Sequence, residues 1–149
     1  MKQSYFSPVI KPEDGSRITD EFRNIYKWLN SNFNTFLAVL TTTGATVTDI
    51  ASVYLLEGDV VYVEAQVVAA ETDQSNRALY HRAGLFYRAT AGNVTQQGST
   101  TALATIESDA DWDLTLNADT TAQATDVRVT GKVATVINWK AIIKYMKVS

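Results

Sequence analysis

The clearest pattern along the chain is an alternation of apolar and polar residues with a period of two. It recurs in several segments after residue 60 and gives each of them one mainly apolar face. A period of two with one polar face predicts antiparallel strands, each buried on one side. The apolar positions are Val61, Val63, Ala65, Val67 and Ala69; Leu79, Ala83, Leu85 and Tyr87 (alternating with Arg82 and Arg88); Trp112, Leu114 and Leu116; Val127 and Val129; and Trp139, Ala141, Ile143 and Tyr145.

Turn-forming residues separate these apolar runs. We expect about eight strands over residues 38–149, joined by short turns without an intervening helix. This pattern favours a mostly β fold, an antiparallel β-sandwich of jelly-roll type. The small polar residues from Asn117 to Thr125 indicate a loop or an irregular edge. The predicted turns are Glu57–Asp59, Thr72–Asn76, Ala91–Asn93, Glu107–Asp111 and Thr130–Lys132.

The first 37 residues follow a different pattern. Residues 1–15 include Pro8 and Pro12 and show no periodicity, which predicts an extended anchoring arm. Residues 16–37 predict an amphipathic α-helix, with Asp20 in its first turn, where the helix dipole favours a negative charge. The apolar stripe of this helix recurs at spacings of four, three and four residues. It consists of Ile18, Phe22, Ile25 and Leu29 and is widened by Tyr26 and Trp28.

This apolar stripe is too short to hold a coiled coil by itself. It either packs on its own chain or on a symmetry-related copy, or it inserts into a groove of a foreign partner. With the aromatic residues of the arm, it supplies the residues that we expect to anchor the chain or to form an oligomer. These residues are Tyr5, Phe6, Ile18, Phe22, Ile25, Tyr26, Trp28 and Leu29.

Composition excludes several classes of function. The 149 residues contain no cysteine and one histidine, so disulfides, thiolate metal sites and most zinc sites are excluded. The net charge of −3 argues against nucleic-acid binding. No apolar run has the length of a membrane span, and the N-terminus lacks the apolar core of a secretory signal. We expect no nucleic acid and no membrane among the partners.

An acidic run and a basic C-terminal end are the strongest charge features. Counted from Asp109, a calcium loop of EF-hand type needs glycine at the sixth position and glutamate at the twelfth. Leu114 and Thr120 occupy these positions, so the run is expected to be a solvated turn. The basic residues either protect a sheet edge or face an acidic turn of a neighbouring subunit. They are Lys132, Lys140, Lys144 and Lys147.

Candidate catalytic chemistry is sparse. His81 lies in a predicted strand, where Glu64 or Glu71 could approach it across a hairpin, but a general base also needs a pocket. The sequence holds no phosphate-binding glycine loop, no G-x-S-x-G elbow and no H-E-x-x-H motif. We therefore predict no enzymatic activity, no catalytic residue, no metal ion and no cofactor.

Aromatic residues could form a platform for a sugar. Trp112 and Trp139 lie on the apolar sides of their alternations, so core packing is the better explanation for both. The tyrosines are the remaining candidates for a surface patch, without a diagnostic spacing. They are Tyr54, Tyr62, Tyr80 and Tyr87.

From Thr41 to Val148 the chain resembles a β-domain that recurs in structural proteins of tailed bacteriophages, often at the C-terminal end of tail-fibre-like chains. The most specific pieces are an acidic turn followed by tryptophan, the run V-R-V-T-G, and a terminal N-W-K strand. The matching segments are 46–55 (TVTDIASVYL), 62–69 (YVEAQVVA), 77–88 (RALYHRAGLFYR), 107–114 (ESDADWDL), 126–131 (DVRVTG) and 137–140 (INWK).

The resemblance implies a non-enzymatic virion structural protein, made in the cytoplasm of a bacterial host and exposed on the phage particle. Fibre proteins with this domain usually have a long repetitive shaft before it, whereas an arm and one helix precede it here. This departure favours a capsid decoration (cement) or head-fibre protein. The alternative is a short tail fibre, tail knob or adaptor, with a host-surface glycan as a ligand. Such parts are commonly trimeric, so we expect a homotrimer bound to the major capsid protein or to tail proteins.

Overall fold

Eight antiparallel strands make up most of residues 34–149, the part of the chain that the computed structural model describes. They follow one another without an intervening helix, as the alternation predicts. Within this range, the structure holds no helix with the length and apolar character of a membrane span. The strands are β1 (Thr35–Thr42), β2 (Thr48–Tyr54), β3 (Val60–Glu71), β4 (Arg77–Arg88), β5 (Val94–Glu107), β6 (Asp113–Asp119), β7 (Ala124–Thr130) and β8 (Ile137–Val148).

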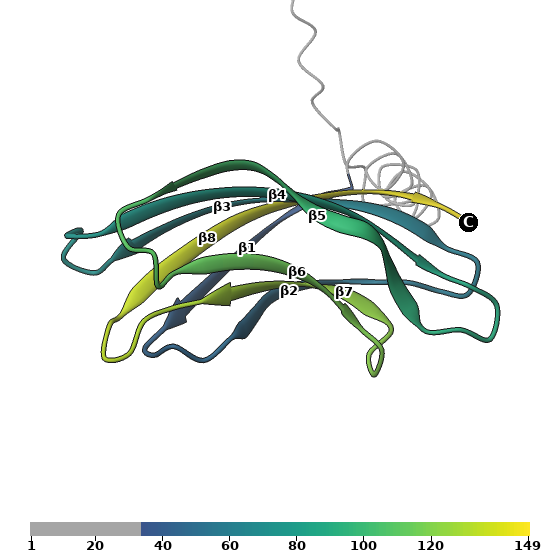
Figure 1. The fold of residues 1–149 in the computed structure, drawn as a ribbon, viewed down its shortest axis with the longest axis horizontal. Helices are drawn as coiled ribbons and strands as arrows, with labels where there is room; N and C mark the ends of the chain where they lie inside the picture. Colours follow the sequence, from purple (N-terminus) through teal and green to yellow (C-terminus); the bar gives the residue numbers. More distant parts are fainter. Residues whose placement is uncertain (1–33) are drawn as a thin grey trace, which may run out of the picture. The chain divides into compact units, whose positions relative to one another are not determined.

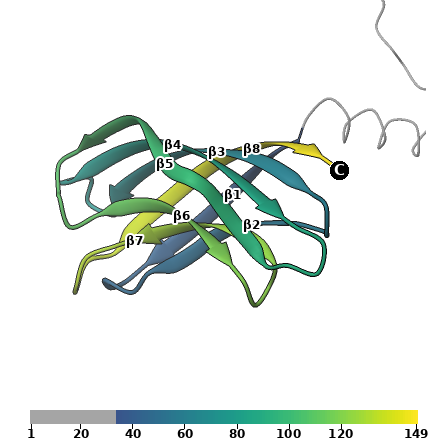
Figure 2. The ribbon, with the colours of Figure 1, turned by 45° about the vertical axis from the view of Figure 1, so that its right-hand side comes forward.

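The strands form two sheets that stack as layers (Figures 1 and 2). The larger sheet has the order β1-β8-β3-β4-β5, and the smaller has the order β2-β7-β6. All pairings are antiparallel, which confirms a mostly β, antiparallel two-sheet architecture. The jelly-roll connectivity is not confirmed, because β3, β4 and β5 lie side by side in chain order as a meander.

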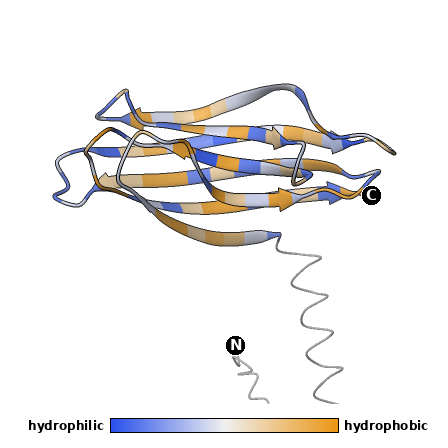
Figure 3. Ribbon diagram, turned by 90° about the horizontal axis from the view of Figure 1, so that it is seen from below, coloured by the Kyte–Doolittle hydropathy of each residue, from blue (hydrophilic) through white to orange (hydrophobic). Residues whose placement is uncertain are grey.

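The core lies between the two sheets, and the alternation identifies most of it. The predicted inward faces of β3, β6, β7 and β8 are confirmed. Trp112, which directly precedes β6, is also buried, as predicted. Figure 3 shows the alternation as bands of apolar and polar residues along the strands. The confirmed buried positions are Val61, Val63, Ala65, Val67, Ala69, Trp112, Leu114, Leu116, Val127, Val129, Trp139, Ala141 and Ile143.

Strand β4 presents the opposite face from the one predicted. Tyr80 and Phe86 are fully buried, whereas Leu85 is exposed on the outer face. Apolar residues occupy both faces of this strand, so the alternation alone does not choose between them. The two large aromatic rings bury more apolar surface than the leucines would. Arg82, on the aromatic side, avoids the core by donating to the Ala104 carbonyl oxygen at 2.8 Å and by lying over the Tyr80 ring.

Two predicted boundaries are wrong. Residues 35–37 of the helix expected over residues 16–37 are not helical, because Thr35, Phe36 and Leu37 belong to β1 and pair with β8. The loop expected from Asn117 to Thr125 is shorter, because its two ends extend β6 and β7. In both places the backbone hydrogen bonds of a neighbouring strand override a weak local pattern. The arm predicted over residues 1–15 and the rest of the predicted helix lie outside the described residues.

A close backbone approach leaves no room for a side chain at Gly131. A Cβ at this position would lie 2.6 Å from the Gly44 carbonyl oxygen and 2.7 Å from Thr42 Oγ1. We expect Gly131→Ala to lower the free energy of unfolding by about 1–3 kcal/mol, the usual cost of overpacking. Gly44→Ala is the matched control, because its Cβ would meet nothing within 4 Å. Urea unfolding followed by tryptophan fluorescence measures both variants, and equal stabilities would contradict the prediction.

Candidate functional site

The anchor residues predicted from the sequence all lie outside the described residues. They are Tyr5, Phe6, Ile18, Phe22, Ile25, Tyr26, Trp28 and Leu29. The structure therefore bears on the other candidates: the acidic turn, the histidine, the aromatic residues and the exposed face of the larger sheet.

The most specific pieces of the phage β-domain pattern meet in one cluster. The rings of Trp112, after the acidic turn, and Trp139, in the N-W-K strand, lie 5.8 Å apart between centroids. The indole Nε1 of Trp139 donates a hydrogen bond to Thr42 Oγ1 at 2.9 Å. Gly131, which ends V-R-V-T-G, packs against the same threonine. These residues are buried or tightly packed, so the sequence pattern marks residues that stabilise the fold.

Lys132 offsets part of the charge of the acidic turn within the chain. Lys132 Nζ lies 2.7 Å from Asp109 Oδ2 and 3.2 Å from Asp111 Oδ2. The hydrogen bond from Lys132 lowers the pKa of Asp109, and its bonds to both aspartates raise the pKa of Lys132. The sequence left open whether the basic residues face an acidic turn of a neighbouring subunit. Lys132 pairs with the acidic turn of its own chain.

His81 does meet Glu64, one of the two carboxylates expected near it. His81 Nε2 lies 2.8 Å from Glu64 Oε1, across the β3–β4 pair on the outer face of the larger sheet. Tyr62 and Gln66 also donate to this carboxylate, each at 3.3 Å, and Lys144 Nζ lies 4.0 Å away. The hydrogen bond from His81 is the main reason why the pKa of Glu64 is lowered. The arrangement is that of a polar network that ties β3, β4 and β8 together.

Apolar side chains surround this polar network on the outer face of the larger sheet. In an antiparallel sheet with one solvated face, that face is expected to be polar. Here each of the five strands contributes at least one exposed large apolar side chain. The residues are Leu37 and Val39 on β1, Ile142 and Met146 on β8, Val60 and Val68 on β3, Leu85 on β4, and Ile106 on β5.

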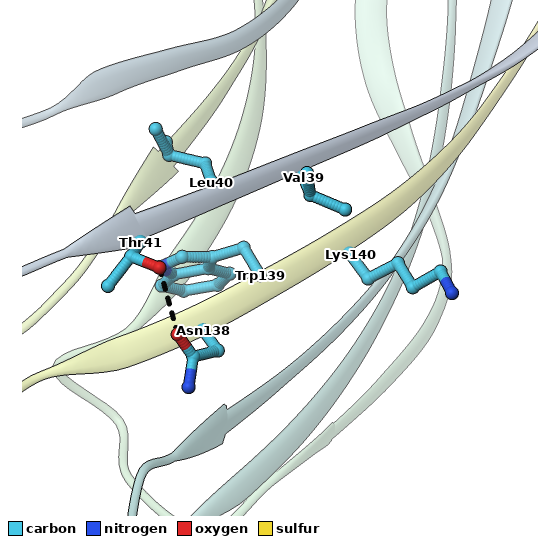
Figure 4. Close-up of a pocket in the computed structure, with 6 residues that line it drawn as sticks. All are labelled: Val39, Leu40, Thr41, Asn138, Trp139 and Lys140. Atoms are coloured by element: carbon cyan, nitrogen blue, oxygen red, sulfur yellow. Dashed lines mark hydrogen bonds between the residues drawn. The ribbon is translucent and has the colours of Figure 1, made fainter.

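A depression of about 410 Å³ lies along β1 and β8 (Figure 4). It is lined by Val39, Leu40, Thr41, Asn138, Trp139 and Lys140. The Thr41 hydroxyl donates to Asn138 Oδ1 at 2.8 Å, which joins the two strands at this point. Trp139 is buried, so its ring offers no face on which a sugar could stack.

The aromatic candidates divide between core and surface. Trp112 and Trp139 are buried, which confirms the prediction that they pack in the core. The prediction that Tyr80 could belong to a surface patch is wrong, because this residue is fully buried and its hydroxyl donates to Glu107 at 2.6 Å. Burial raises the pKa of Tyr80 strongly. Tyr54 is exposed, whereas Tyr62 and Tyr87 are half-buried, so the four tyrosines do not form a common platform.

Phage tailspike proteins are among the solved structures to which this chain is similar. No protein-family model and no curated protein matches this sequence. The tailspike protein of Acinetobacter baumannii phage AM24 aligns with a TM-score of 0.43 and 7% identity, over 74% of this chain. The tailspike protein of Acinetobacter phage vB_ApiP_P1 aligns with a TM-score of 0.27 and 12% identity, over 99% of this chain. This chain spans 26% of the length of each tailspike.

Proposed function

We propose that this chain is a non-enzymatic structural protein of a tailed-bacteriophage particle. Its β-sandwich is the part displayed on the particle surface, and its N-terminal residues attach it to the capsid or to the tail. The observation that supports the proposal is the cluster of Trp112, Trp139 and Gly131 beside the acidic turn that Lys132 pairs with. The pieces by which the sequence resembles a phage β-domain are the same pieces that pack together, so the resemblance has a structural cause.

Copy number in purified particles tests this proposal and locates the protein. Quantitative mass spectrometry would compare this chain with the major capsid protein in particles of the phage that encodes it. Hundreds of copies per particle support a capsid decoration or head-fibre protein. A few to a few tens support a short tail fibre, tail knob or adaptor, for which a host glycan would be the next ligand to test. Absence of the chain from washed, infectious particles would overturn the proposal.

Attachment through the N-terminal segment makes a separate prediction. Residues 35–149 form a compact unit with its own core, so a chain that begins at Thr35 is expected to fold and to unfold cooperatively. Because the proposed anchor residues are missing, this shortened chain should not enter particles when it replaces the full chain during infection. Circular dichroism checks the fold, and immunoblotting of purified particles checks incorporation. Incorporation at the level of the full chain would place the attachment surface in the sandwich.

A further inference from the structure

The last residues of β8 form a short strap at one end of the sandwich. We use the word strap for residues 146–149, which lie at the same end as the β2–β3 turn (Figure 1). Their backbone pairs with β3 from Met146, opposite Tyr62, to Val148, opposite Val60. Met146 is 65% exposed and Val148 is 71% exposed, so these two side chains add little buried surface. The strap therefore depends on its other contacts.

Lys147 makes the main contact of the strap. In the alternation of β8 it falls on the core side, opposite Val61, which is fully buried. A charged group on this side is costly to bury unless it finds a partner. Its Nζ lies 2.9 Å from Asp59 Oδ2 and donates to the Tyr54 carbonyl oxygen, also at 2.9 Å. Because Tyr54 ends β2, this lysine connects the larger sheet with the smaller one.

Asp59 holds the strap at two points. This residue is 2% exposed, and its carboxylate accepts hydrogen bonds from Lys147 and from the Ser149 hydroxyl. The Leu56 backbone N–H donates to the same carboxylate at 2.7 Å and fixes its position. The Asp59 carbonyl oxygen accepts from the Arg88 backbone N–H at 2.9 Å, so β4 supports the turn independently of the strap. One buried carboxylate thus ties the strap to a turn that has its own support.

We propose that the strap is a conformational device that opens as a unit when the Asp59 carboxylate loses its charge, while the rest of the sandwich stays folded. Segments with few buried contacts open locally at a lower free energy than the whole fold. A neutral side chain at position 59 leaves the Lys147 ammonium beside the core without its ion-pair partner, which favours its movement into water. Opening uncovers Val61 at the end of the core.

The preceding part of β8 is held in a different way. Its inward side chains, such as Trp139 and Ile143, are buried in the core between the sheets. Residues 137–144 also pair with β1 on one side and with β3 on the other. Loss of the Asp59 charge removes none of these contacts. We therefore expect the opening to stop before the buried part of the strand.

The other charged groups at this end do not take the place of Asp59. Glu57, in the same turn, pairs with Arg88 at 3.7 Å, and its side chain is 48% exposed. Arg88 also donates to the Leu55 carbonyl oxygen at 3.3 Å. Within the described residues, the carboxylate paired with Lys147 is that of Asp59. One titratable group therefore controls the strap.

Backbone order parameters of the full chain, from ¹⁵N relaxation at neutral pH, test the proposal. In the wild type, residues 146–148 should be as rigid as the core, with values of about 0.85. In Asp59→Asn they should fall below about 0.6, the range of flexible backbone, while residues 137–143 stay rigid. A rigid strap in Asp59→Asn would overturn the proposal. Equal loss of order along all of β8 would also overturn it, because Asp59 would then support the whole strand.

A pair of charge reversals repeats the test from the side of the strap. Lys147→Glu places a second negative charge beside Asp59 and is expected to release residues 146–148 in the same way. Lys140→Glu is the matched control, because it changes the net charge equally on the exposed outer face of the same strand. The strap should stay rigid in this control. Equal flexibility in both variants would show that net charge, and not the contact with Asp59, holds the strap.

Acid provides a third readout, without any substitution. Hydrogen bonds from Lys147 and Ser149 help to keep the folded pKa of Asp59 below its ordinary value. The strap of the wild type should therefore be rigid above the ordinary pKa and become flexible as the pH falls through the folded pKa. In Asp59→Asn it should be flexible at every pH. Loss of order in residues 137–143 at a higher pH than in the strap would contradict local opening. The proposal is independent of the phage function, and its failure leaves the copy-number experiment unaffected.

Discussion

Replacing Trp139 by alanine is expected to lower the free energy of unfolding by about 3–5 kcal/mol, the usual cost of removing a buried tryptophan. The side chain is buried, its ring centroid lies 5.8 Å from that of Trp112 in a tilted contact, and it donates a hydrogen bond to Thr42. Its removal leaves a cavity between the two sheets. Urea unfolding monitored by far-ultraviolet circular dichroism measures the loss without depending on tryptophan fluorescence.

Two further variants separate packing from hydrogen bonding at this site. Thr42→Val keeps the volume but leaves the indole N–H of Trp139 without its acceptor, so we expect a loss of about 1–3 kcal/mol. Trp139→Phe keeps part of the ring contact and should lose less stability than alanine. A loss below about 1 kcal/mol in Trp139→Ala would be typical of a surface change and would contradict the central place of this cluster in the core.

The second large effect is expected for Asp59→Asn, at about 2–3 kcal/mol. Asp59 is 2% exposed, in the turn between β2 and β3. Its carboxylate accepts a hydrogen bond from the Leu56 backbone N–H at 2.7 Å, pairs with Lys147 Nζ at 2.9 Å and also bonds to Ser149. Removing one partner of a fully buried ion pair costs about 3–5 kcal/mol. The partial exposure of Lys147 reduces the figure, and chemical denaturation at neutral pH measures it.

We also expect Asp59 to make the stability of the fold depend on pH. Burial raises the pKa of Asp59, but the hydrogen bonds from Lys147, Ser149 and Leu56 outweigh it, so the folded pKa lies below the ordinary value. An unfolded aspartate has a pKa of about 3.9, so this stabilisation is complete above that pH. It is lost as the pH falls through the lower folded pKa. Stability of the wild type should therefore decline more steeply in acid than that of Asp59→Asn.

An exposed aspartate provides the control for this pH dependence. Asp73 lies in the β3–β4 turn, where hydrogen bonds from Ser75 lower its pKa. Its interactions are exposed to solvent, so Asp73→Asn should change stability far less than Asp59→Asn at neutral pH. Parallel stability profiles of the wild type and Asp59→Asn between pH 2 and pH 7 would show that Asp59 titrates alike in both states.

The alternation of residues predicted the buried face of a strand correctly where one face is clearly apolar and the other clearly polar. Strand β3 shows this best, because Val61, Val63 and Val67 are fully buried while Glu64 and Gln66 lie on the outer face. The turn at Glu57–Asp59 was also predicted from the sequence, since glycine and aspartate favour turns. The expected hairpin allowed either Glu64 or Glu71 to approach His81, and the structure shows that Glu64 does.

The alternation of residues did not predict the buried face where both faces of a strand carry similar residues. Strand β4 has apolar residues on each face, and the packing of Tyr80 and Phe86 against the other sheet decided the choice. Strand β5 is mostly exposed on both faces, and Gly98 interrupts it, so it lacks a burial signal that a sequence could display. Pairing with β4 holds it in place.

The sequence by itself determined a mostly β fold, the buried tryptophans and most of the turns, because residue type and spacing are local properties. Only the tertiary structure decided the order of strands in the two sheets, the burial of Asp59 and the position of β1 at the edge of the larger sheet. These features depend on hydrogen bonds and ion pairs between residues far apart in the chain, such as Asp59 and Lys147. No local periodicity records which distant strand will supply the partner.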